Sequence, residues 1–278
     1  MVSLLTFQND GLSFDVDDSG GDGDGVILLH GFPQTKESWH AVTPALIDAG
    51  YRVLTPDQRG YSPAARPPRR RDYSLDKLVG DVIALADRAQ LERFHVIGHD
   101  WGGAVAWGLA AGHPERLASV ASLSTPHPRA MAASLVRSTQ LLKSWYMAAF
   151  QLPILPERFV SLGGGKRVHA QLVESGLPGP QAAASVELLT SGGARSTIAW
   201  YRALPFSPPA LGSASTVPTL YVYGDDDFAL GRTAADLTSK YVTGPYRYEV
   251  LPGVGHWIPE HPEALNPILL EHLAAHPV

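Results

Sequence analysis

Hydrophobic positions along the chain follow two patterns, one typical of strands and one typical of helices, which alternate along the sequence. Short apolar runs such as Val26 to His30 indicate strands, whereas apolar residues three or four positions apart, as in Ser74 to Gln90, indicate helices. Strands that alternate with helices favour βαβ units around a mostly parallel sheet flanked by helices. The pattern predicts hairpin strands over 4–8 and 12–16, strands over 26–30, 52–55, 94–97, 117–123, 219–223 and 246–251, and helices over 38–49, 74–90, 102–112 and 262–275.

This alternation stops after residue 127. Residues 128–208 carry mainly helical patterns, interrupted by the Gly- and Pro-containing stretches LPILPE, SLGGGK and SGLPGP. We therefore predict an α/β core formed by residues 1–127 and 209–278, with residues 128–208 inserted as a helical lid.

Composition narrows the function. The 278 residues are 45% hydrophobic, enough for one large α/β domain with an insertion, and the net charge of −5 gives no reason to bind nucleic acid or an anionic membrane. The absence of cysteine excludes a disulfide framework and a thiolate metal site. The first ten residues lack a signal-peptide pattern, and no apolar run approaches the roughly 20 residues that span a bilayer. We expect a soluble cytoplasmic protein that acts on a small molecule.

One dense basic run, RPPRRR over Arg66 to Arg71, stands out against this acidic background. Prolines interrupt it and no aromatic residues are interleaved with it. We interpret it as a solvated loop, with a phosphate-binding patch as the alternative.

Candidate chemistry centres on Gly98-His99-Asp100-Trp101-Gly102, which joins a predicted strand to a predicted helix. This is the pattern of a nucleophile elbow, but an aspartate takes the place of the usual serine. A carboxylate that attacks saturated carbon leaves an ester, which water can hydrolyse; a serine would leave an ether. The aspartate could instead simply cap the helix, so other motifs must support catalysis. His99 is interpreted as a packing residue.

Three further motifs follow predicted strands. HGFPQ offers the backbone N–H of Phe32, which with that of Trp101 could form an oxyanion hole, because Pro33 has no N–H. GDDDF supplies the acids 225–227, and GVGHW supplies His256. The chain order nucleophile, acid, histidine is that of α/β-hydrolase triads.

Together, HGFP, DQRGYS, GHDWGG, GDDDF and GVGHW resemble the α/β-hydrolase superfamily, and specifically its epoxide hydrolases, over nearly the whole chain. The resemblance implies a covalent ester on Asp100 and its hydrolysis by water that His256 activates. It favours Asp227 over Asp225 as the acid, because the family acid commonly stands three residues after the glycine. An epoxide substrate, water and no cofactor follow from it.

The lid stretches SWYMAAFQLP and AWYRALPF resemble the segments from which epoxide hydrolases present two tyrosines, here Tyr146 and Tyr201. A tyrosine acid suits epoxide opening, since an alkoxide needs a proton, although aromatic packing alone could also explain these residues. Further substrate contacts are expected from His30, Pro33, Trp145, Trp200 and Trp257, and no metal site is expected.

Two other functions remain open from the sequence. A haloalkane dehalogenase would use the same aspartate, with the tryptophan after it and a second tryptophan or an asparagine as halide ligands. The asparagine commonly stands where this chain has Phe32, and a halide needs no tyrosine acid. A non-catalytic receptor could keep the pocket without turnover. A carboxylate-bearing substrate is disfavoured, because fluoroacetate dehalogenases carry arginine where Trp101 stands.

Overall fold

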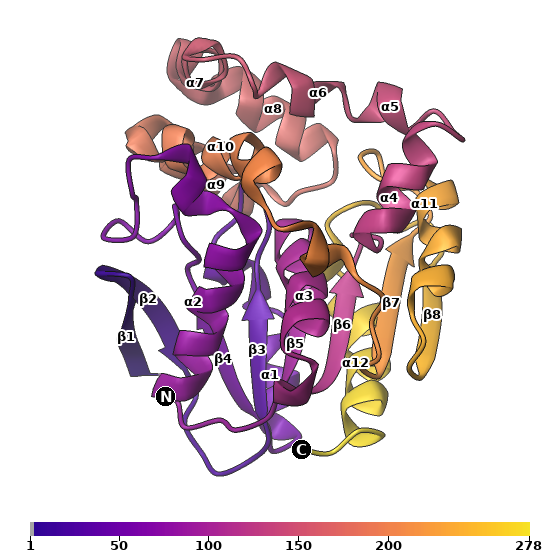
Figure 1. The fold of residues 1–278 in the computed structure, drawn as a ribbon. Coiled ribbons are helices and arrows are strands. Elements are labelled where there is room, and N and C mark those ends of the chain that lie inside the picture. The colour runs from indigo at the N-terminus through magenta and orange to yellow at the C-terminus, as the bar shows by residue number, and fades with distance from the viewer. Residues whose placement is uncertain (1–2) are drawn as a thin grey trace.

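The computed structural model describes residues 3–278, in which eight strands form one twisted sheet in the order β1-β2-β4-β3-β5-β6-β7-β8 (Figure 1). β1 and β2 form an antiparallel hairpin, β2 also runs antiparallel to β4, and the remaining pairs are parallel. The strands are β1 (Ser3–Asn9), β2 (Leu12–Asp18), β3 (Gly25–Leu29), β4 (Arg52–Pro56), β5 (Phe94–His99), β6 (Leu117–Leu123), β7 (Thr219–Gly224) and β8 (Tyr246–Leu251). The α/β fold with a mostly parallel sheet is confirmed.

Helices cover both faces of the sheet, because the central parallel strands are apolar on both sides. Leu78 and Val82 of α2 and Val105 of α3 pack into one buried cluster, and Leu46 of α1 and Leu269 of α12 pack into another. The helices are α1 (Thr43–Asp48), α2 (Leu75–Arg88), α3 (Trp101–Gly112), α4 (Pro128–Leu135), α5 (Gln140–Lys143), α6 (Trp145–Ala149), α7 (Leu155–Ser161), α8 (Lys166–Glu174), α9 (Gly179–Leu188), α10 (Ala194–Ala203), α11 (Arg232–Leu237) and α12 (Pro262–Ala274).

Two local predictions differ from the structure. The helix expected over 38–49 is divided into a 3₁₀ turn, Lys36–Trp39, and α1, which starts beside Pro44. Proline is tolerated only in the first turn of a helix, so the helix restarts there. The short helix α11 is absent from the predicted elements.

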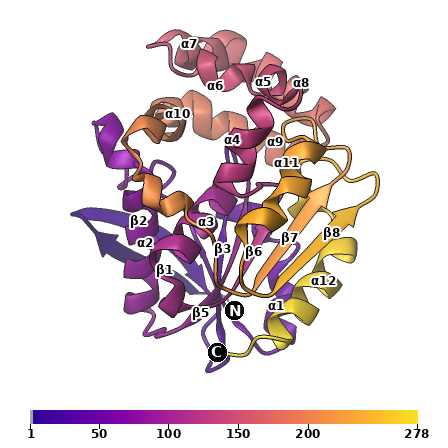
Figure 2. The ribbon, with the colours of Figure 1, turned by 45° about the vertical axis from the view of Figure 1, so that its right-hand side comes forward.

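Residues 128–208, here called the lid, contain α4 to α10 and lie above the carboxyl ends of the strands (Figures 1 and 2). The mainly helical character expected for this stretch is confirmed, while its limits as a domain stay a prediction. Every helix among residues 3–278 is too short or too polar to cross a bilayer. The lid faces the strand ends where the motifs identified from the sequence converge.

A buried ion pair fixes the segment that follows β4. The Arg59 guanidinium, 2% exposed, donates two hydrogen bonds of 2.7 Å to Asp81 of α2, and the Arg59 carbonyl accepts one from Trp200 in the lid. Burial raises the pKa of Asp81, although the contacts with Arg59 oppose that effect. The pair therefore links the sheet, α2 and the lid. Removing either partner would leave the other buried charge without its closest counter-ion, which strongly lowers the free energy of unfolding.

We expect Asp81→Asn to lower the free energy of unfolding by about 3–5 kcal/mol, because the buried guanidinium then has only the half-exposed carboxylate of Asp10, at 3.3 Å, as its counter-ion. Asp87→Asn on the same helix removes a pair with Arg116 whose carboxylate is 61% exposed, and should cost less than about 1 kcal/mol. Urea unfolding followed by circular dichroism measures both. Equal losses would contradict the importance of burial.

Candidate active site

Asp100 occupies a sharp turn between β5 and α3. Its backbone has φ 50° and ψ −119°, a strained conformation for a residue with a side chain. The flanking glycines are required, because a Cβ on Gly98 would lie 2.2 Å from the Gly102 carbonyl oxygen and one on Gly102 would lie 2.0 Å from that of Leu29. The turn thus aims the Asp100 carboxylate toward the lid, as expected of a nucleophile elbow.

Backbone donors hold this carboxylate. The Phe32 N–H donates to Asp100 Oδ1 at 2.8 Å, and the Trp101 N–H also hydrogen-bonds to the side chain. Burial raises the pKa of Asp100, but the neighbouring His256 outweighs burial and the net change is downward. Asp100 is therefore an anion at neutral pH, and the two predicted oxyanion donors already face it.

His256 lies between two carboxylates. Its Nδ1 is 2.9 Å from Asp227 Oδ2, and its Nε2 is 3.6 Å from Asp100 Oδ2. Burial disfavours the protonated ring, but the charges of Asp227 and Asp100 prevail and raise the pKa of His256 to about 10. The histidine is thus a cation while both carboxylates are charged.

Asp227 is fully buried and well supplied with donors. Its Oδ1 accepts hydrogen bonds from the N–H groups of Ala229 at 2.7 Å and Leu230 at 2.9 Å. Burial raises its pKa, but His256 and the hydroxyl of Ser124 overcome that effect and bring it to about 2. Asp225 is exposed and accepts from the Gly253 N–H instead. The structure therefore brings Asp227, and not Asp225, to His256.

Sequence reasoning missed Ser124 and Thr125, which follow β6. The Ser124 hydroxyl contacts both Asp227 Oδ2 and, at 3.1 Å, His256 Nδ1, while the Thr125 hydroxyl donates to the Asp100 carbonyl at 2.6 Å. Their only signal in the sequence is a position at the carboxyl end of a central strand, where sites of open α/β sheets gather.

His99 supports the loop that carries His256. Burial lowers the pKa of His99 to about 4, so the ring is neutral, and its Nε2–H donates to the His256 carbonyl at 2.8 Å. It holds the backbone of the other histidine and does not enter the cavity.

A cavity of about 310 Å³ lies between Asp100 and the lid. Tyr146 of α6 and Tyr201 of α10 contribute to its wall, with ring centroids 6.0 Å apart, and Trp101 packs 4.9 Å from the Tyr201 ring. Burial and the Asp100 charge raise the pKa of both tyrosines, which keeps their hydroxyl protons in place at neutral pH. Most of the remaining lining is apolar, including Met131, Leu135, Met147, Leu204 and Leu230.

Arg202 at the end of α10 connects the two tyrosine-bearing helices. Its guanidinium donates to the carbonyls of Phe150 and Leu152, after α6, and pairs with Glu157 of α7 at 2.5 and 3.0 Å. Gln151 adds a 2.9 Å hydrogen bond to the Tyr201 carbonyl. The segments that carry Tyr146 and Tyr201 are therefore bonded to each other.

Among the expected substrate contacts, only Trp200 lines this cavity, and its Nε1–H is used by the Arg59 carbonyl. The structure does not bring the other four to the cavity wall. His30 is buried and accepts from the Gln58 N–H, Pro33 is buried, and the Trp257 indole donates to Ser175. Trp145 is 69% exposed. In the part of the chain described, no three His, Asp or Glu side chains gather to hold a metal ion.

Comparisons with known proteins identify the family of the chain. Residues 25–261 match the family model of the alpha/beta hydrolase fold. Epoxide hydrolase A of Mycobacterium tuberculosis is 33% identical, over 89% of each chain, and the AB hydrolase superfamily protein YfhM of Bacillus subtilis is 36% identical, over 91% of each. The crystal structure of epoxide hydrolase A from Mycobacterium thermoresistibile matches with a TM-score of 0.84 at 27% identity, over 99% of this chain and 98% of that one.

The chain therefore belongs to the α/β-hydrolase family, in the branch that contains the epoxide hydrolases. The family predicted from the five motifs is confirmed.

We expect Asp227→Asn to lower the pKa of His256 by about 1–3 pH units, because the ring loses the negative charge at Nδ1. Asp225→Asn removes the same charge at an exposed position and should leave the pKa nearly unchanged, since solvent screens it. NMR titration of the His256 ring nitrogens measures both variants. A larger effect from Asp225 would make that residue the partner of the histidine.

Proposed function

We propose that the protein hydrolyses epoxides to vicinal diols through an ester on Asp100. The observation that carries this proposal is a charged carboxylate, held by two backbone N–H groups, at a cavity that also contains two protonated tyrosines. Nucleophile and acid therefore meet in one small, mostly apolar space. The similarity to relatives that are named epoxide hydrolases supports the same reaction.

In the first step, an Asp100 oxygen attacks one carbon of the epoxide. The carbon–oxygen bond of the ring breaks, its electron pair moves to the ring oxygen, and that oxygen takes a proton from Tyr146 or Tyr201. A phenol is a suitable donor because the alkoxide it protonates is the stronger base. Holding both tyrosines over the cavity positions the acid before the carbon is attacked.

The second step depends on the charge that the first one removes. Once Asp100 is an ester, it no longer raises the pKa of His256, so the ring can lose its proton more easily. Neutral Nε2 then accepts a proton from water, and the resulting hydroxide attacks the ester carbonyl. Phe32 and Trp101 N–H groups stabilise the oxyanion, and Asp227 stabilises the protonated ring.

Both steps use only residues of this chain and water. Each proton taken from a tyrosine must later return from His256 or solvent, which restores the starting state. A haloalkane dehalogenase would also use Asp100, but its reaction gives no role to the tyrosines. This chain has Phe32 where such an enzyme commonly has an asparagine that binds the halide.

We expect His256→Gln to accumulate the ester. Styrene oxide should raise the mass of the intact variant by one epoxide equivalent, because alkylation proceeds while hydrolysis loses its base. His113→Gln, which changes a 40% exposed side chain outside the site, should turn over without accumulating adduct. Asp100→Ala combined with His256→Gln should stay unmodified. An unmodified His256→Gln protein would contradict the covalent route.

Wild-type protein given styrene oxide and 1-bromobutane in parallel should form diol and release no bromide. Tyr146→Phe with Tyr201→Phe should lower diol formation by about 10²–10⁴-fold, because both ring-oxygen donors are lost. Phe150→Leu, beside both rings, serves as a packing control and should retain most of the activity. Diol is followed by chromatography and bromide by ion analysis. Bromide without diol would establish the dehalogenase instead.

A further inference from the structure

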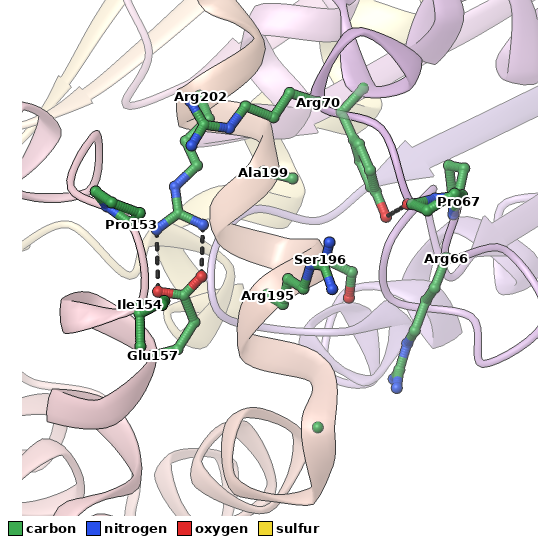
Figure 3. A pocket seen from close by; sticks show the side chains of 13 residues that line it. Arg66, Pro67, Arg70, Pro153, Ile154, Glu157, Arg195, Ser196, Ala199 and Arg202 are labelled. Carbon is green, nitrogen blue, oxygen red and sulfur yellow. Dashed lines mark hydrogen bonds and ion pairs between the residues drawn. The ribbon is translucent and has the colours of Figure 1, made fainter.

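A second cleft, larger than the catalytic cavity, lies between the basic run and the lid. It has a volume of about 700 Å³ and is shown in Figure 3. Arg66 and Arg70 belong to the segment between β4 and α2, while Arg195 belongs to α10. Residues far apart in the sequence thus line one cleft, with the Arg66 and Arg70 side chains extending to different sides of it (Figure 3). Arg69 to Arg71 are exposed, as expected of a solvated loop, whereas Arg66 is half-buried.

The cleft carries excess positive charge. Four arginines and one glutamate line it, in a chain with a net charge of −5. The glutamate, Glu157, is already paired with Arg202 through the two bonds drawn as dashed lines in Figure 3. Within residues 3–278, no carboxylate lies within 4.0 Å of the other three guanidinium groups. Three arginines therefore line the cleft without a close ion pair, although the charge of Arg195 reaches Glu157.

Arg66 shows the lack of a partner most directly. One of its terminal nitrogens donates to the Tyr61 carbonyl at 3.1 Å, but its buried Nε has no hydrogen-bond partner within the described residues. The charges of Arg66 and Arg195 both reach the hydroxyl of Tyr73, which also lines the cleft. Buried polar groups are normally satisfied, so Arg66 Nε retains an unused donor beside the cleft.

We propose that this cleft binds a small organic oxyanion with at least two negative charges, of the phosphate monoester type. Guanidinium groups pair with phosphate and carboxylate oxygens through parallel hydrogen bonds. Pro67, Pro153, Ile154 and Ala199 line the same space and offer apolar contact to the body of the ligand. The volume falls within the range of small-molecule sites.

Such a ligand would connect the core to the lid. Arg66 and Arg70 approach it from the core, whereas Arg195 lies on α10, the helix that also places Trp200 and Tyr201 at the catalytic cavity. A bound oxyanion would therefore hold α10 against the segment before α2. Binding can therefore be followed through the protection of α10, without any assay of epoxide turnover.

Calorimetric titration with pyrophosphate and phenyl phosphate in 0.15 M NaCl tests the site. Arg70→Gln with Arg195→Gln should weaken binding at least about tenfold, because charge-assisted bonds are lost. Arg69→Gln with Arg71→Gln changes the net charge equally, at exposed positions of the same run that do not line the cleft, and should change affinity less than about twofold. Both pairs are exposed, so the fold should survive each change.

A loss of affinity in the Arg70→Gln, Arg195→Gln variant alone supports the site. Titration with glutarate as a third ligand distinguishes a preference for phosphate from a general site for dianions. Absence of saturable binding up to about 10 mM, or equal weakening by both variants, would overturn the proposal. Hydrogen exchange of the α10 amides should slow with pyrophosphate in the wild type only. Repeating the titration in Asp100→Ala separates binding from the proposed hydrolysis.

Discussion

A negative charge kept inside a mostly apolar cavity is the constraint on which this site depends. Asp100 retains that charge because two backbone N–H groups and a protonated His256 outweigh the cost of burial. The elbow that positions it requires close backbone contacts at Gly98 and Gly102, so the end of β5, the start of α3 and the loop after β3 must all fit together. The sheet order, with β3 and β6 on either side of β5, places these segments where that fit is possible.

The same charge organises its surroundings. It raises the pKa of His256 and, together with burial, that of both tyrosines, so each group holds a proton before reaction. Neutralising Asp100 by forming an ester would release the histidine from this effect. In the proposed reaction, the charge of Asp100 would thus also control the protonation of His256 and so the order of the two chemical steps.

Sequence patterns could predict the strands, most helices and the residues that meet at Asp100, because these depend on local periodicity and on motifs at strand ends. They could not predict the break in the helix before Pro44 or the short helix α11. They also could not predict the contacts of Ser124, which arise from packing between segments distant in the sequence. Four expected substrate contacts, including Trp145 and Trp257, do not reach the cavity, since aromatic residues next to a motif can face either way. The alternative interpretation of the basic run gains support only when Arg195 is placed beside it.

The bonds made by Arg202 have a mechanical consequence. Tyr146 and Tyr201 stand 55 positions apart in the chain, yet one guanidinium and the Gln151 amide bond their segments together. If the lid shifts to admit a substrate, the two hydroxyls travel as a single body and their spacing is preserved. Access to the cavity and the placement of the two phenol groups are thereby separate degrees of freedom, so the entrance can vary without changing the spacing of the tyrosines.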